Sequence, residues 1–196
     1  MEGTRATPCS AFAGTRRLAS GPLEQVVLVV KAWLEHHPET PVLTLDDRTG
    51  KVVDLDVRGT PAEVLERLPL PEPPRGPGRP RLGVVAREVT LLPRHWEWLN
   101  AQPGGASVAL RKLVEEAGRA PREQRRQAQE RTFRAMSALG GDEAGYEEAL
   151  RALYAGDPGA FGKHLRTWPE EIRAYVLEQA RAAFPESSTS KEDLDD

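Results

Sequence analysis

The segment from Pro69 to Leu82, PLPEPPRGPGRPRL, constrains the fold most, because no helix or regular strand can run through it. Each proline lacks an amide hydrogen and fixes its own backbone angle, and it also disfavours helix in the residue before it. The segment is therefore predicted to be an extended linker, residues 69–82. A chain of 196 residues divided in this way can form units with hydrophobic cores on either side.

The sequence before the linker predicts a small α+β domain, residues 9–68, with the element order β-α-β-β-α. One or two short strands are expected around Gly14, and a helix is expected to start at Pro22, which suits a first helical position. The apolar side chains of this helix recur with the helical period, so one side should pack against a sheet.

The second half of this domain is predicted to contain a β-hairpin and a short helix. Val42–Asp46 and Lys51–Val57 both have strand character, and the turn Asp47-Arg48-Thr49-Gly50 between them suits a hairpin. Thr60-Pro61-Ala62-Glu63 is a capping box, in which the threonine hydroxyl and the glutamate carboxylate each satisfy a free backbone amide. It should open the last helix of the domain.

Residues 83–118 are predicted to form a strand, Val84–Leu92, followed by a helix from Pro93, a Gly-Gly turn and a second helix capped by Ser107. An isolated strand has an unpaired edge, and two short helices bury little of their own surface. Both problems disappear if the strand pairs with its copy in a second chain. The sequence therefore predicts a homodimer.

Residues 119–184 are predicted to be a helical region in which Asp142 and Asp157 cap helices, and residues 185–196 an acidic, disordered tail. Trp96 and Trp98 cannot both face one core from a single helix. One of the two is predicted to be buried, and the other is a candidate anchor for a partner surface.

The stretch from Val84 to the second helix resembles the ribbon-helix-helix family of bacterial DNA-binding proteins. The matching features are the strand ending at Leu92-Pro93, the helix from Arg94, the glycine turn and the second helix opened by Ser107. Membership would imply an intertwined dimer whose two-stranded ribbon enters the major groove of DNA. It would also imply that amides near Gly105, Ala106 and Ser107 hold a phosphate.

The chain departs from that family along the ribbon itself. In one register the outward residues are Arg87, Val89 and Leu91, and in the other they are Glu88, Thr90 and Leu92. In the first set two of the three residues are apolar, and in the second Glu88 would face phosphate, so neither register gives a good reader of base edges. The dimer needs only the backbone edge and the apolar faces, so it is unaffected.

The linker gives a second indication of DNA contact. Gly78-Arg79-Pro80-Arg81 resembles the core of an AT-hook, in which Arg-Gly-Arg-Pro lies in a narrow A·T minor groove. Here Pro77 stands before the glycine, where the AT-hook has arginine. The residues predicted to contact DNA are Arg79, Arg81, Arg87, Gly105, Ala106, Ser107 and Arg111.

The predicted function is thus that of a dimeric DNA-binding protein, such as a transcriptional regulator. The net charge of −3 shows that the chain as a whole is not a basic nucleic-acid binder. The alternative is a non-enzymatic protein-interaction module, whose arginine-rich stretch Arg119–Arg134 could bind an acidic partner. A third alternative is an enzyme that uses the aspartates of the predicted hairpin.

Several kinds of site are not indicated. Asp46, Asp47, Asp54 and Asp56 could bind a divalent cation, but their spacing matches no known cation loop and a solvated strand face explains them equally. No catalytic constellation, metal site or cofactor motif is predicted, and the single cysteine, Cys9, excludes an internal disulfide. Without an apolar run or a signal peptide, no membrane contact is predicted and the expected location is the cytoplasm.

Over nearly its full length the chain resembles a bacterial family catalogued as a domain of unknown function, number 2239 in that series. The segments that carry the resemblance are SAFAGTRRLASGPL, DLDVRGTPAEVL, GRPRLGVVAREVTLLPRHWEWLNAQPGGASVALRKLVEEA, RALYAGD and RTWPEEIRAY. This resemblance implies no activity.

Overall fold

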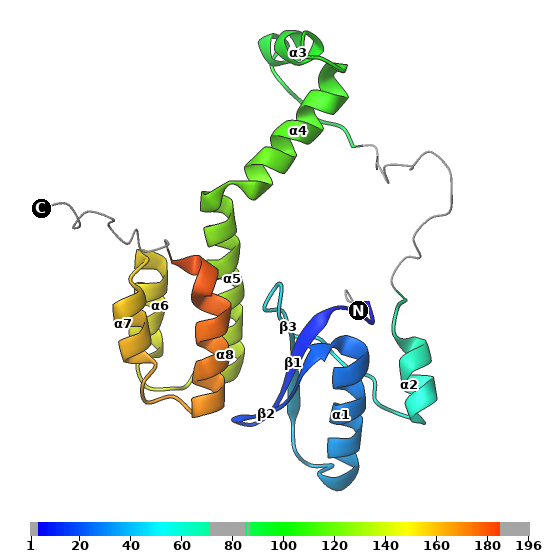
Figure 1. Ribbon diagram of the computed structural model, residues 1–196, viewed down its shortest axis with the longest axis vertical. Helices are drawn as coiled ribbons and strands as arrows, with labels where there is room; N and C mark the ends of the chain where they lie inside the picture. Colours follow the sequence, from blue (N-terminus) through cyan, green and yellow to red (C-terminus); the bar gives the residue numbers. More distant parts are fainter. Residues whose placement is uncertain (1–3, 71–84, 86, 185–196) are drawn as a thin grey trace, which may run out of the picture. The chain divides into compact units, whose positions relative to one another are not determined.

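The computed structural model describes residues 4–70, 85 and 87–184 (Figure 1). Most of the predicted linker and the predicted acidic tail, residues 185–196, lie outside the described residues. The chain divides into two compact units. One comprises Met1–Pro71 and Arg125–Asp196, and the other comprises Glu72–Gln124. The first unit contains an antiparallel sheet and several helices, which confirms the α+β class.

The sheet has three strands, β1 (Pro8–Ala13), β2 (Arg16–Pro22) and β3 (Val42–Asp46), in the order β2-β1-β3. The tight hairpin between β1 and β2 turns at Gly14, whose φ of 57° suits glycine. Of the one or two short strands expected around Gly14, two are present.

Helix α1 (Leu23–His36) covers one face of the sheet with Leu23, Val26, Val27 and Val30, as its periodicity predicts (Figure 1). Pro22 is the residue before the helix and not its first residue, because its ψ of 140° is extended and it still belongs to β2. Helix α2 (Pro61–Arg67) begins at the predicted capping box, where the Thr60 side chain accepts from the Glu63 amide.

The predicted strand Lys51–Val57 does not form. Its contact with β3 is limited to a bridge between Leu45 and Val52 and two backbone hydrogen bonds. The Asp46 amide donates to the Lys51 carbonyl at 2.9 Å, and the Val53 amide donates to the Thr44 carbonyl at 2.8 Å. Beyond that point the chain leaves the sheet, because Val53, Leu55 and Val57 pack on the core beneath α1. The alternating pattern is satisfied by this packing without a fourth strand.

The helices α5 (Pro121–Gly140), α6 (Tyr146–Ala155), α7 (Pro158–His164) and α8 (Glu170–Ala180), with the 3₁₀ turn Arg181–Ala183, follow. Met136, Leu153, Phe161 and Ile172 are central members of their core. Asp157 caps α7 by accepting from the Ala160 amide, as predicted. Asp142 does not cap α6. The residue before α6 is Gly145, where the chain turns with a φ of 81° close to the His164 carbonyl.

Alternate residues of β1 serve two cores. Cys9 and Ala11 pack beneath α1, whereas Phe12 joins Leu45, Ala135 and Tyr175 in a cluster with α5 and α8. This follows from the two-residue period of a strand. The sheet is thereby covered by α1 on one face and by C-terminal helices on the other.

The second unit contains α3 (Pro93–Asn100) and α4 (Gly105–Arg119), which form a helical hairpin. Ser107 does not cap α4, because the helix already starts at Gly105 behind Gly104, which has a φ of 85°. The described residues 85 and 87–92 form no strand, contrary to the prediction, and none of the described strands pairs with them. No helix within the described residues is long and apolar enough to cross a membrane.

Candidate functional site

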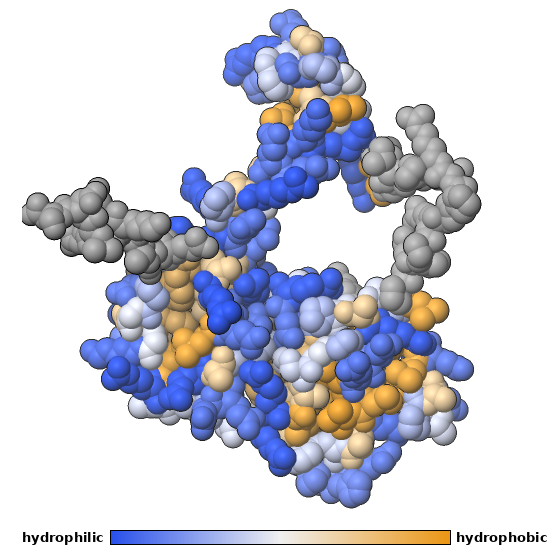
Figure 2. Space-filling model, viewed as in Figure 1, coloured by the Kyte–Doolittle hydropathy of each residue, from blue (hydrophilic) through white to orange (hydrophobic). Residues whose placement is uncertain are grey.

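The α3–α4 hairpin leaves most of its apolar side chains in contact with solvent. Among its described residues only Leu99 and Ala109 are buried. Trp98 is 53% exposed, Leu113 is 42% exposed and Val114 is 69% exposed. Figure 2 shows orange, hydrophobic residues beside blue, hydrophilic ones on the surface of the hairpin. An amphipathic helix with an uncovered apolar stripe normally packs against something else.

A shallow groove of about 170 Å³ runs between the two helices. Its lining, which we call the hairpin groove, consists of Trp98, Gln102, Pro103, Ala109, Lys112, Leu113 and Glu116. The groove thus combines an aromatic ring and aliphatic side chains with one cation and one anion. Aromatic side chains flanked by polar groups are typical of the centre of a protein interface.

The two charges of the hairpin groove have no ionic partner in the described part of this chain. Within the described residues neither Lys112 nor Glu116 forms an ion pair, although they are one helical turn apart. The lysine precedes the glutamate, which is the less favourable order for a pair within a helix. The neighbouring Glu115, in contrast, lies 3.8 Å from Arg119.

The structure describes some, but not all, of the residues predicted to contact DNA. Arg79 and Arg81 lie outside the described residues, and Arg87 is exposed on the irregular segment before α3. The Gly105 amide donates to the Gln102 carbonyl at 2.9 Å, so it is already used. Ala106 and Ser107 occupy the first turn of α4, which has no side-chain cap, and the half-buried Arg111 lies in the next turns of the same helix.

The prediction that either Trp96 or Trp98 is buried is wrong. Both are exposed, and Leu99 supplies the buried side chain of α3. The signal that the sequence did carry is the spacing of Lys112 and Glu116 around Leu113 and Val114. Spacing alone could not show that these two charges lack an ionic partner among the described residues.

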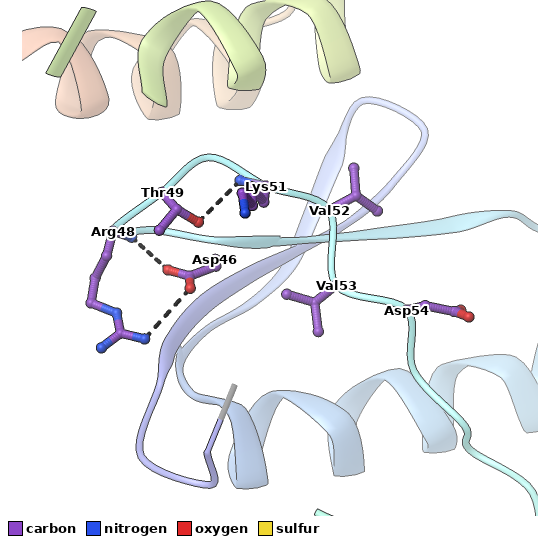
Figure 3. A pocket seen from close by; sticks show the side chains of 7 residues that line it. All are labelled: Asp46, Arg48, Thr49, Lys51, Val52, Val53 and Asp54. Carbon is purple, nitrogen blue, oxygen red and sulfur yellow. Dashed lines mark hydrogen bonds and ion pairs between the residues drawn. The ribbon is translucent and has the colours of Figure 1, made fainter. Parts of the chain in front are cut away.

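A second, more polar pocket of about 480 Å³ lies at the turn after β3 (Figure 3). Asp46 is buried there, and its Oδ1 accepts from the Arg48 amide at 2.8 Å while its Oδ2 lies 3.5 Å from the Arg48 guanidinium. Asp54 points away from this pair. The carboxylate at the pocket wall is therefore already neutralised by its neighbour.

The four aspartates considered as a cation site have separate partners or directions. Asp56 binds Arg58, and this hydrogen bond holds the pKa of the Asp56 carboxyl below its ordinary range. Asp47 accepts from Tyr175 Oη at 2.8 Å and from Ser10 Oγ at 3.2 Å. Across residues 4–70, 85 and 87–184 no three side chains of metal-binding type converge.

Asp47 ties the sheet to α8. Burial raises the pKa of the Asp47 carboxyl, while the hydroxyls of Tyr175 and Ser10 oppose this rise by donating to the charged form. Burial likewise raises the pKa of Tyr175, with the nearby Asp47 adding to it, and raises the pKa of Cys9 to about 12. A buried thiol with such a pKa is a poor nucleophile, so this cluster is best explained as a structural connection.

A family model described as "Uncharacterized protein conserved in bacteria (DUF2239)" matches residues 8–180. The match spans both units, from β1 to the end of α8. No curated protein and no solved structure matches the chain.

Proposed function

The chain belongs to the bacterial family DUF2239, whose description names no activity, and from that premise we propose a non-enzymatic protein-interaction module that pairs with its own copy. The contact surface in this proposal is the α3–α4 hairpin. The observation that carries it is the exposure of Trp98, Leu113 and Val114 on a hairpin with only two buried side chains among its described residues.

Covering the exposed apolar surface of the hairpin would be energetically favourable. Fully burying one Val or Leu side chain contributes about 1.5–3 kcal/mol, and the exposed apolar residues of the hairpin forgo that gain in a single chain. Two of them, Trp98 and Leu113, are contiguous, since both line the hairpin groove. Contiguous apolar patches rimmed by charge commonly mark contact with another protein.

Leu113→Asp is expected to convert a dimer into a monomer. The substitution places a charge in the middle of the surface that the second copy would cover, where it would be buried without a partner. Sedimentation velocity at micromolar concentrations measures the change in mass.

Leu177→Asp is the matched control for this experiment. Leu177 is 41% exposed, close to the 42% of Leu113, but it lies on α8 in the other unit. This variant should sediment as the wild type does. A monomeric wild type, or equal dissociation of both variants, would remove the proposal.

DNA binding is the second candidate. The observation in its favour is the start of α4, where Gly104 before the helix and Gly105 at its first position both have positive φ and no side chain caps the helix. Helix amides that no side chain caps can hold a phosphate, and Arg87 and Arg111 add positive charge on the same unit. Arg79 and Arg81 would enter the minor groove in this proposal, as the AT-hook resemblance implies. A regulator of transcription would combine these contacts with the dimer.

A mobility-shift assay at low and high salt tests the DNA candidate. Phosphate contacts make the affinity fall steeply with salt, because counterions are released on binding. Replacing Arg79 and Arg81 by alanine together should reduce that salt dependence, as should Arg111→Ala. The absence of any shift at low salt with genomic fragments would rule out this candidate while leaving the interaction module intact.

A further inference from the structure

We propose that two copies pair through antiparallel α4 helices, side by side along the face that carries Lys112 and Glu116, so that Lys112 of each copy meets Glu116 of the other. This arrangement rests on the proposed self-association and specifies its geometry. It makes the hairpin groove the interface, with the second copy as its occupant.

A twofold interface needs a surface that complements itself, because the same patch is presented by both copies. Lys112 and Glu116 have this property. They have opposite charge, lie one helical turn apart on one side of α4, and have Val114 midway between them in the sequence. Reversing the helix direction about that midpoint places each cation level with the anion of the other copy.

A parallel pairing of the same surfaces is disfavoured by the same charges. It would bring Lys112 level with Lys112 and Glu116 level with Glu116. Like charges facing each other at an interface oppose association, whereas opposite charges select the register. The direction of the helices therefore follows from the order of these two residues.

Two of the exposed apolar side chains lie where this pairing would cover them. Leu113 lines the groove between the two charged positions in the sequence, and Trp98 approaches the same groove from α3. Val114 lies about 200° around α4 from Lys112, so it stays outside this contact. Burial of Leu113 and Trp98 would supply the affinity, and the two ion pairs at the margin would fix direction and register.

Other charges of α4 do not offer an equivalent pair. Glu115 already lies near Arg119 within the same helix. Lys112 and Glu116 lack such a partner among the described residues, so they can enter an intermolecular pair without breaking an internal one.

The test uses the full-length chain with Lys112→Glu and Glu116→Lys, separately and together. Each single variant replaces two attractions by two repulsions across the interface, so its dimer should dissociate at roughly tenfold higher concentration. The double variant restores opposite charges in the reverse order and should dimerise as the wild type does.

Mixing the two single variants gives a sharper result. The Lys112→Glu copy carries a carboxylate at both positions, and the Glu116→Lys copy carries an ammonium group at both. In the mixed dimer each carboxylate therefore meets an ammonium group, so both contacts are attractive. Native mass spectrometry, with one variant labelled by heavy nitrogen, should show mixed dimers well above the statistical half. Far-UV circular dichroism checks that each variant remains folded.

The outcomes separate this arrangement from the proposed function. If the single variants dimerise like the wild type, or if mixing gives only statistical pairing, the antiparallel α4 arrangement is wrong. The interaction module survives that result when Leu113→Asp still dissociates the dimer and Leu177→Asp does not. A wild-type chain that stays monomeric removes both.

Discussion

Gly50→Ala is expected to destabilise the unit formed by the sheet and the C-terminal helices by about 3 kcal/mol or more. Gly50 has a φ of 68°, which a residue with a side chain adopts only at a cost. Its position is also crowded, because an added Cβ would collide with the carbonyl oxygen and Cα of Arg131 in α5. These are backbone atoms of a long helix, so they cannot move aside as a flexible side chain would.

Gly14→Ala separates the two contributions and serves as the control. Gly14 has a similar φ of 57°, but an added Cβ there would meet nothing within 4 Å. Replacing it should lower the free energy of unfolding only by the cost of a left-handed backbone conformation, about 1–2 kcal/mol. Urea denaturation followed by circular dichroism measures both. If both variants lose the same free energy of unfolding, the collision of the added Cβ with Arg131 does not add to the cost of Gly50→Ala.

The sequence could predict those parts of the fold that depend on neighbours in the chain. The turn at Gly14, the capping box at Thr60 and the cap at Asp157 each require only a few adjacent residues. The Thr60, Glu63 and Asp157 side chains satisfy backbone groups within the same turn, and glycine readily takes the positive φ at residue 14, so the local pattern is sufficient to identify them.

The failed predictions have a common physical cause. The Lys51–Val57 segment has the alternating pattern of a strand, but Val53, Leu55 and Val57 pack against the core beneath α1. The segment therefore leaves β3 soon after the bridge at Val52. Asp142 and Ser107 are good capping residues, but Gly145 and Gly104 are the residues that precede α6 and α4. Each of these glycines turns the chain with a positive φ. In each case a competing interaction decides, and the local pattern does not reveal it.

The same limit applies to the candidate sites. The aspartates around the turn after β3 are near one another in sequence, yet Asp47 is held by Tyr175, a residue 128 positions away. No local pattern indicates that pairing. The spacing of Lys112 and Glu116 on α4 is visible in the sequence. Only the positions of the other charged side chains in the structure show that these two lack an ionic partner among the described residues.

Tyr175→Ala is expected to produce the other large loss of stability, about 3–5 kcal/mol. The side chain is 1% exposed and its ring lies 5.2 Å from that of Phe12, so its removal leaves a cavity between the sheet and α8. The Arg17 guanidinium also lies over both rings, 5.1 Å from the centre of Tyr175 and 5.6 Å from that of Phe12. Thermal and urea denaturation of the full chain measure the loss.

Tyr175→Phe isolates the hydroxyl and should show a dependence on pH. Burial raises the pKa of Asp47 in the folded chain above its ordinary value of 3.8. The proton on Asp47 therefore contributes stability that is complete below that value and is lost as pH rises through the higher folded pKa. The Tyr175 hydroxyl reduces this loss, because it donates to the charged carboxylate at 2.8 Å.

Removing the hydroxyl should consequently cost little where Asp47 is protonated and about 1–3 kcal/mol at neutral pH, where the carboxylate is charged and half-buried. Urea denaturation of wild type and Tyr175→Phe, at a pH below the ordinary value of 3.8 and at pH near 7, gives the two differences. Asp47→Asn provides the control, since an amide carries no charge at either pH. In that background Tyr175→Phe should cost nearly the same at both values. If Tyr175→Phe lowers the free energy of unfolding equally at both pH values in the wild-type background too, the hydrogen bond from Tyr175 does not stabilise the charged Asp47 carboxylate.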